Sequence, residues 1–148
     1  MSAFRLSGAF PARLGAYKEI ETLLQQFAAQ AVLGRDDGLR LTLIVEELFT
    51  NTVLHGHGGD SDALVEVTLE IAEERIVLTY QDSAKAYNPL AAAQKADTAL
   101  PLEQRRVGGL GMLLTVTLCQ EARYSYVEGR NRVELMLARS EAGKTGTG

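Results

Sequence analysis

Two short stretches in which apolar and polar residues alternate constrain the fold more than any other part of the chain. They cover residues 65–71 and 76–80, and Glu73 and Glu74 lie between them. Strict alternation is typical of a strand that buries one face. Strands joined by so short a turn run antiparallel. The sequence therefore predicts a hairpin whose two strands are half-buried.

The other periodic segments place helices and further strands around this hairpin. Helical spacing of apolar residues predicts helices over Arg13–Leu33, Leu39–Gly58 and Leu110–Gln120. Further strands are expected at Phe4–Gly8, as an edge strand, and in a closing hairpin formed by Arg123–Glu128 and Arg132–Leu137. This order does not alternate strands with helices as a doubly wound fold does. We expect an α+β two-layer sandwich with a mixed, largely antiparallel sheet and helices on one face.

The composition excludes several classes of protein. The 148 residues fit one domain, 1–140, and a polar, glycine-rich tail, 141–148, that we expect to be disordered. A net charge of −4 argues against a general nucleic-acid binder, and no apolar run is long enough to span a membrane. The single cysteine, Cys119, fits a reducing cytoplasm, and its apolar surroundings favour packing over a nucleophilic role. We expect a cytoplasmic protein with neither nucleic-acid nor membrane partners.

The predicted helix over Leu39–Gly58 carries polar side chains beside its apolar stripe. Glu47, Asn51 and His55 each follow the last by four residues, so they share a face. A carboxylate and an amide at the border of a buried face are costly to desolvate without partners. Either they form the solvated edge of an amphipathic helix, or a ligand or metal supplies the partners. His55 and His57 are too few for a zinc site without cysteine ligands.

Later segments supply groups that suit a nucleotide. Asp82 lies at a predicted strand end, where its carboxylate can accept a hydrogen bond from an amine such as that of adenine. The glycines in Gly108–Met112 let the backbone approach a phosphate at the start of a helix, where anions are favoured. Asn51 can hold Mg²⁺ through its side-chain oxygen, and Glu47, one turn earlier, can take a proton from an attacking hydroxyl.

In their order and spacing these motifs resemble the GHKL ATP-binding superfamily, of the gyrase, histidine kinase and MutL type, which has the Bergerat fold. The resemblance is nearest to the small bacterial anti-sigma factor serine kinases of partner-switching systems, and it extends over nearly the whole chain. It rests on five segments: Glu47–Asn51, Leu54–Gly56, Asp82–Pro89, Gly108–Met112 and Tyr124–Val133.

The resemblance implies a role for each matching residue. Glu47 corresponds to the general base that activates a substrate serine, Asn51 to the Mg²⁺ ligand and Asp82 to the adenine-binding carboxylate. The ATP site is further expected to include the glycines at the hinge of the ATP lid and the residue after them: Gly108, Gly109, Gly111 and Met112. The lid itself corresponds to the segment between Pro89 and Val107.

The activity implied by the resemblance is that of a Mg²⁺-ATP-dependent serine/threonine kinase. Such a kinase phosphorylates a small antagonist protein of the anti-anti-sigma type and holds a sigma factor or similar regulator. Family members are commonly homodimers, and the edge at Phe4–Gly8 is a candidate interface. The alternative is a degenerate module that sequesters its partner with weak or no ATP binding. A sensor histidine kinase fragment is a third interpretation, but the chain has no room for a phosphoacceptor helix pair.

One departure from the family pattern supports the degenerate module. The family has glycine two residues after the aspartate, and this chain has Ala84 there. If that position has a positive φ, alanine is strained by about 1 kcal/mol or more. If the glycine only makes room for adenine, the methyl group crowds the base. Lys85, which follows, either faces solvent or reaches a phosphate.

Overall fold

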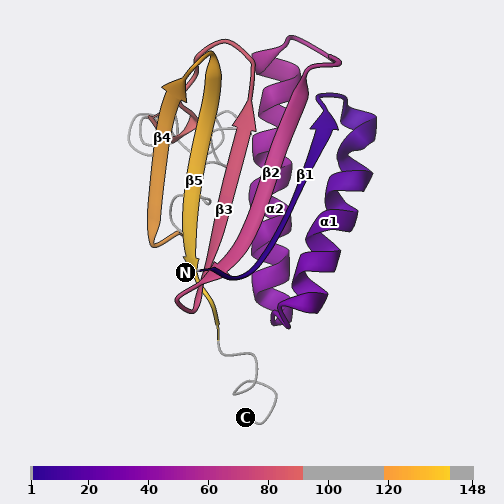
Figure 1. Cartoon of the computed structure of the whole chain (residues 1–148). Helices are drawn as coiled ribbons and strands as arrows, with labels where there is room; N and C mark the ends of the chain where they lie inside the picture. The colour runs from indigo at the N-terminus through magenta and orange to yellow at the C-terminus, as the bar shows by residue number, and fades with distance from the viewer. Residues whose placement is uncertain (1, 92–118, 141–148) are drawn as a thin grey trace, which may run out of the picture.

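A five-stranded sheet forms one layer of the protein (Figure 1). The structure, a computed structural model, describes residues 2–91 and 119–140. The strands are β1 (Ser2–Pro11), β2 (Leu64–Ala72), β3 (Arg75–Asp82), β4 (Glu121–Val127) and β5 (Arg130–Ala138). Their order is β1-β2-β3-β5-β4, and each neighbouring pair is antiparallel. The predicted edge strand, both predicted hairpins and the antiparallel sheet are confirmed.

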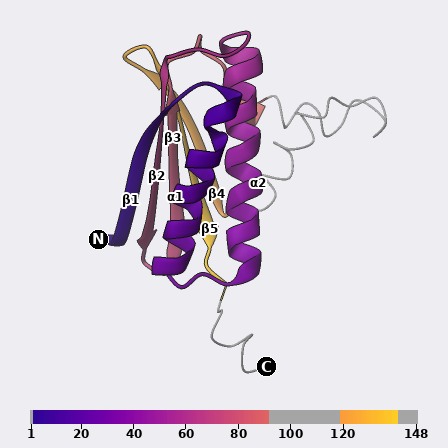
Figure 2. The same ribbon diagram turned by 90° about the vertical axis from the view of Figure 1, so that its right-hand side faces the viewer.

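The second layer consists of helices on one face of this sheet (Figure 2). A short 3₁₀ turn, η1 (Leu14–Ala16), leads into α1 (Tyr17–Gln30). The next helix, α2 (Arg35–Asn51), continues directly into a π-helical turn, η2 (Thr52–Gly56). Helix α2 begins before the predicted residue Leu39 because Gly34 is extended and ends the preceding segment, and Asp36 and Asp37 favour the first turn. The predicted α+β fold is confirmed.

The core lies between the two layers. Alternate residues of β2 and β5 point toward the helices and are buried, which is the outcome that the alternating sequence pattern predicts. The prediction of a half-buried strand is wrong for β3, which lies in the middle of the sheet and buries every residue from Ile76 to Tyr80. On the helices, the core is formed by Ile20, Leu24, Phe27, Leu41, Ile44, Val45, Leu48 and Phe49. The ring of Phe4 on β1 stacks on Phe27 with centroids 5.6 Å apart. None of the described helices covers the opposite face of the sheet.

The end of β5 is tied to the helices by a buried carboxylate. Asp37, in the first turn of α2, is 1% exposed and pairs with Arg40. It also accepts hydrogen bonds from the backbone nitrogen and the hydroxyl of Ser140, at 2.9 and 2.8 Å. Burial raises the pKa of Asp37, but the hydrogen bonds from Arg40 and Ser140 outweigh it and lower the pKa below its usual value. This contact joins the chain after β5 to the first turn of α2.

Several sequence predictions concern residues outside the described ranges. They are the lid up to Val107, the glycine segment Gly108–Met112, the greater part of the helix Leu110–Gln120 and the tail 141–148. Cys119 lies just inside the described part and packs partly buried against the core. Burial raises the pKa of its thiol to about 11, so the thiolate is scarce at neutral pH. Among the described helices, none has the length and apolar character needed to cross a membrane.

Candidate functional site

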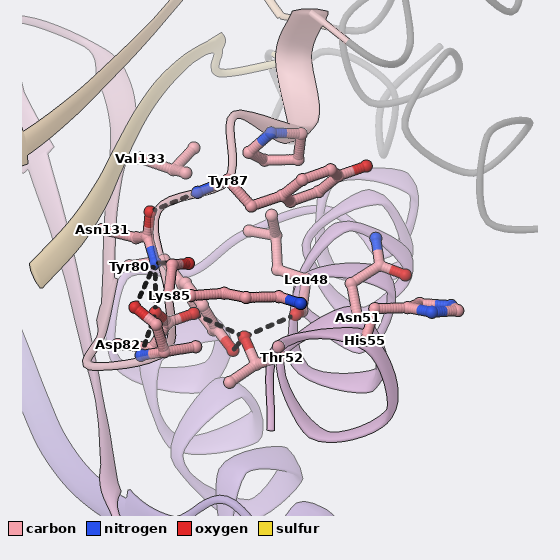
Figure 3. A pocket seen from close by; sticks show the side chains of 13 residues that line it. Leu48, Asn51, Thr52, His55, Tyr80, Asp82, Lys85, Tyr87, Asn131 and Val133 are labelled. Atoms are coloured by element: carbon pink, nitrogen blue, oxygen red, sulfur yellow. Dashed lines mark hydrogen bonds between the residues drawn. The ribbon is translucent and has the colours of Figure 1, made fainter. Parts of the chain in front are cut away.

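A pocket opens where α2 and η2 meet the loop that follows β3 (Figure 3). Its lining residues come from three parts of the chain that are far apart in sequence. They are Leu48, Asn51, Thr52, His55, Gly56, Tyr80, Asp82, Ala84, Lys85, Tyr87, Pro89, Asn131 and Val133. Two of the residues singled out from the sequence, Asn51 and Asp82, are therefore brought to the same pocket.

Asp82 forms the most buried charged group of the pocket, being 7% exposed at the end of β3. One carboxylate oxygen, Oδ1, accepts hydrogen bonds from Asn131 Nδ2 at 2.8 Å and from the backbone nitrogen of Ala84 at 3.1 Å. The other, Oδ2, accepts one from Thr52 Oγ1 at 2.8 Å. A carboxylate can accept about four hydrogen bonds, so these three donors fix its orientation and leave it able to accept another.

A chain of hydroxyl groups lies behind this carboxylate. Thr52 Oγ1 is 2.7 Å from the phenolic oxygen of Tyr80 and 2.8 Å from Asp82 Oδ2. Thr52 Oγ1 also lies 3.0 Å from the carbonyl oxygen of Leu48, so its one hydroxyl proton is shared between two acceptors, Leu48 and Asp82, and Tyr80 is the group that donates to it. Burial holds the pKa of Tyr80 well above its usual value, so that this phenol remains a donor. The chain therefore runs from Tyr80 through Thr52 to Asp82.

Asn131, near the start of β5, fixes the loop after β3. Its Nδ2 lies within hydrogen-bond distance of the carbonyl oxygens of Ala84 and Lys85, at 3.1 and 3.0 Å, as well as of Asp82. Its Oδ1 accepts from the backbone nitrogen of Tyr87 at 3.0 Å and from the hydroxyl of Tyr124. The loop is thus held on both sides of Lys85 by one side chain.

Sequence reasoning did not find Thr52, Tyr80 or Asn131. Asn131 did leave a signal, because it is in phase with the buried residues Val133 and Leu135 on the same strand. A polar residue at a buried position of a strand needs a hydrogen-bond partner, so it marks a polar contact. Thr52 has no such signal, because it lies in line with the apolar residues of its helix.

Glu47 and Asn51 lie one helical turn apart on α2. Asn51 Nδ2 donates to Glu47 Oε2 at 3.1 Å, and this leaves the amide oxygen of Asn51 for another partner. Glu47 is half-buried, and this burial raises the pKa of its carboxyl despite the hydrogen bond from Asn51. Glu47 does not line the pocket itself, whereas Asn51 and His55 do.

The π-helical turn η2 shapes the rim of the pocket. The backbone nitrogen of His57 donates to the carbonyl of Thr52 at 2.9 Å, which is the wider spacing of a π turn. Thr52, His55 and Gly56, all within this turn, line the pocket. Turns of this kind occur frequently at functional sites.

Ala84 has no backbone strain, so the interpretation based on a strained alanine is wrong. Positive φ at described non-glycine residues is found only at Val32, Glu73, Glu74 and Glu128. The Ala84 methyl group instead occupies space that Gly56 leaves open. A Cβ atom placed on Gly56 would lie 2.8 Å from Ala84 Cβ. The second interpretation, in which the methyl group crowds a bound base, stays a prediction.

The donor set of the pocket suits Mg²⁺ held together with a phosphate. This ion takes oxygen ligands and is commonly bound through one or two protein groups plus phosphates and water. The free oxygen of Asn51 is such a group. In the described ranges there is no cluster of three or more His, Cys, Asp or Glu side chains that would form an all-protein metal cage.

Comparison with known proteins assigns the chain to a family. Residues 10–137 match the model of the histidine kinase-like ATPase domain. This chain belongs to the histidine kinase-like ATPase family. The match covers most of the sequence and confirms the resemblance to the GHKL superfamily. It includes the segments that carry Glu47, Asn51 and Asp82.

Curated relatives of this ATPase domain are serine-protein kinases and anti-sigma factors. Serine-protein kinase RsbW of Listeria monocytogenes is 29% identical over 92 residues, which cover 60% of this chain and 59% of that protein. Anti-sigma F factor of Shouchella clausii is 28% identical over 98 residues, covering 66% of each. The chain therefore spans less than two thirds of the length of these relatives.

Two solved structures share the fold. The SiaB-SiaC complex from Pseudomonas aeruginosa matches with a TM-score of 0.59 at 15% identity, covering 89% of this chain and 88% of that chain. A histidine kinase domain from a blue-light activated kinase of Erythrobacter litoralis matches with a TM-score of 0.54 at 14% identity, covering 90% and 64% respectively. At sequence identities this low, the similarity to these two structures shows a shared fold and nothing about function.

Proposed function

We propose that this domain binds ATP with Mg²⁺ in the pocket between Asp82 and Asn51 and transfers a phosphoryl group to a protein serine or threonine. The observation that carries the proposal is Asp82, a buried carboxylate with a fixed orientation that can accept one more hydrogen bond. Kinship with RsbW supports the phosphotransfer.

The base of the nucleotide is proposed to lie at the Asp82 end of the pocket. The free acceptor site of Asp82 suits the exocyclic amine of adenine, and Leu48, Val133 and Pro89 offer apolar surface for the ring. The side chain of Asn88 accepts hydrogen bonds from the backbone nitrogens of Leu90 and Ala91, at 2.9 and 3.4 Å. These bonds fix the helical turn that holds Pro89 at the wall.

The chemistry is proposed to take place at the Asn51 end. Bound ATP supplies the phosphoryl group, and Mg²⁺ neutralises the charge of its phosphates. Asn51 is proposed to ligate the ion through its amide oxygen while its nitrogen orients Glu47. Glu47 then accepts the proton of the attacking hydroxyl, and its raised pKa makes it a better base than an exposed glutamate. The glycines 108, 109 and 111, with Met112, are proposed to hold the phosphates.

The partners are proposed by analogy with the relatives. A small antagonist protein of the anti-anti-sigma type is the proposed substrate, and a sigma factor or similar regulator is the proposed second partner, because one relative is an anti-sigma factor. We place the reaction in the cytoplasm, where an unpaired Cys119 stays reduced. A homodimer is proposed through β1, an edge strand of the sheet. Light scattering that gives a monomer mass would rule the dimer out.

Calorimetric titration with Mg-ATP and Mg-ADP tests the nucleotide site, with Asp82→Asn as the variant. We expect micromolar binding by the wild-type protein and a loss of roughly 10- to 100-fold in the variant, because a hydrogen bond to a charged group is removed. Circular dichroism of the variant checks that it is folded. No binding by the wild-type protein up to millimolar nucleotide contradicts the proposal.

Glu47→Gln tests the phosphotransfer separately from binding. The glutamine keeps the size of the side chain but cannot accept the proton, so nucleotide affinity should persist while phosphorylation of the antagonist protein falls at least about 100-fold. A pull-down from cells supplies that protein for the assay. Undiminished phosphorylation by the variant would remove Glu47 from the mechanism.

A second candidate function is a partner-sequestering module without turnover. It is favoured by one observation, the Ala84 methyl group in the pocket lining, which we expect to crowd a bound base. The same titration separates the two candidates. Absence of nucleotide binding combined with stable capture of a regulator supports the module.

A further inference from the structure

We infer that Lys85 is the cationic contact for the phosphates of the bound nucleotide and makes the pocket select nucleotides over nucleosides. The inference rests on the proposed function and adds to it a residue that discriminates between ligands. It starts from the position of Lys85 in the loop after β3, three residues beyond the buried carboxylate of Asp82.

The backbone of Lys85 is fixed although its side chain is exposed. Its carbonyl oxygen accepts from Asn131 Nδ2 at 3.0 Å, and the preceding residue, Ala84, is 5% exposed and bonded to Asp82. On the other side, the backbone nitrogen of Tyr87 is bonded to Asn131. A loop held in this way determines the direction in which its side chain leaves, so the backbone needs little ordering when a ligand binds.

The side chain of Lys85 extends across the pocket (Figure 3). It leaves the Asp82 side and points toward α2, where Leu48 and Asn51 lie. The amine and the Asp82 carboxylate thus face different parts of the pocket. A ligand with an amine on its base at one end and a phosphate at the other matches this separation of charges.

The amine has no carboxylate partner in the described part of the chain. The described ion pairs all involve arginine, and Lys85 is the one lysine or arginine among the pocket-lining residues. Neither Asp82 nor Glu47 forms an ion pair with Lys85: the hydrogen bonds of Asp82 come from Thr52, Ala84 and Asn131, and that of Glu47 comes from Asn51. A phosphate entering the pocket therefore gains a charge-assisted contact without breaking an existing ion pair.

Titrations with ADP and with adenosine test the inference, because the two ligands share the base and ribose and differ in the phosphates. They are made with the wild-type protein, Lys85→Met and Lys85→Arg. Lys18→Met is the matched control, since it removes the same charge from an exposed position on α1 outside the pocket lining. If the change in net charge alone lowers the affinity for ADP, both methionine variants show the same loss of affinity.

We expect Lys85→Met to weaken ADP binding by roughly tenfold in low salt and to leave adenosine binding unchanged. Lys85→Arg should keep most of the ADP affinity, and the defect of Lys85→Met should shrink as salt screens the contact. Equal weakening of ADP and adenosine, or no weakening of either, overturns the inference while the proposed ATP site stands. Failure of the wild-type protein to bind either ligand overturns the inference together with the proposed function.

Discussion

The contact between Gly56 and Ala84 gives a sharp test of how the pocket is built. An alanine at Gly56 would place its Cβ atom 2.8 Å from Ala84 Cβ, well inside the roughly 3.5–4.0 Å of a favourable carbon contact. Both atoms are attached directly to backbone, so neither can rotate away. Gly56 has no positive φ, and the substitution therefore meets no backbone strain besides this overlap.

The expected change in the free energy of unfolding of Gly56→Ala is the sum of two opposing effects. Alanine in place of a helical glycine gains about 0.5–1 kcal/mol, and overpacking at a buried contact costs about 1–3 kcal/mol. We expect Gly56→Ala to lower the free energy of unfolding by about 1–2 kcal/mol. Ala84→Gly alone should lower it by about 1 kcal/mol through loss of a buried methyl group. The double variant moves the methyl group across the contact, so its effect should be smaller than the sum by about 1–2 kcal/mol.

Urea unfolding followed by far-ultraviolet circular dichroism measures these values, since the chain contains no tryptophan for fluorescence. Gly38→Ala is the matched control, because Gly38 lies in α2, the helix that continues into η2, and an added Cβ there meets no atom within 4 Å. That control should be neutral or stabilising. Additive effects of the two substitutions at the contact would show that the methyl groups do not meet and refute the reasoning.

Two further predictions concern stability away from the pocket. Val32 lies two residues beyond the end of α1, has φ 54° and is 70% exposed. The backbone nitrogens of Leu33 and Val32 donate to the carbonyls of Ala28 and Ala29, respectively, as in a glycine-terminated helix. Val32→Gly should raise the free energy of unfolding by about 1 kcal/mol and Val32→Ala should not, which urea unfolding of both variants checks. Asp37 has a lowered pKa in the folded state, so its ionised carboxylate adds to the free energy of unfolding at pH values above its unfolded-state pKa of 3.8. This contribution is lost as the pH falls through the folded-state pKa. The Asp37→Asn variant should therefore be less stable than the wild-type protein at pH 7 but lose less stability on acidification. Equal loss of the free energy of unfolding in both proteins between pH 7 and pH 2 would contradict this.

The strands and the two long helices were predictable because their signals are local. Alternation in residues 65–71 reports the one buried face of β2, and the apolar residues in 76–80 mark β3, whose middle position in the sheet buries both of its faces. The grouping of Glu47 and Asn51 on one helix face followed in the same way from their spacing. Element bounds shifted at the start of α2, which begins at Arg35 directly after the extended residue Gly34.

The lining of the pocket was less accessible to sequence reasoning. Asn131 contacts Asp82 across a sequence separation of 49 residues, and Thr52 contacts Asp82 across 30. Neither pairing has a local pattern, because hydrogen bonds between strands and helices depend on the register of the sheet and on the seating of the helix against it. The space that Gly56 leaves for the Ala84 methyl group was also inaccessible, because it depends on the distance between two backbone segments that are far apart in sequence.

By itself the sequence determined the hairpins, the amphipathic helices and the family motifs, since each is written in the spacing of neighbouring residues. Tertiary structure decided which side chains meet at the pocket. It set the three donors around Asp82, the anchoring of the loop by Asn131 and the direction of Lys85. The physical reason is that burial removes water from a polar group and obliges it to find a partner, and only the packed chain determines which partner is within reach.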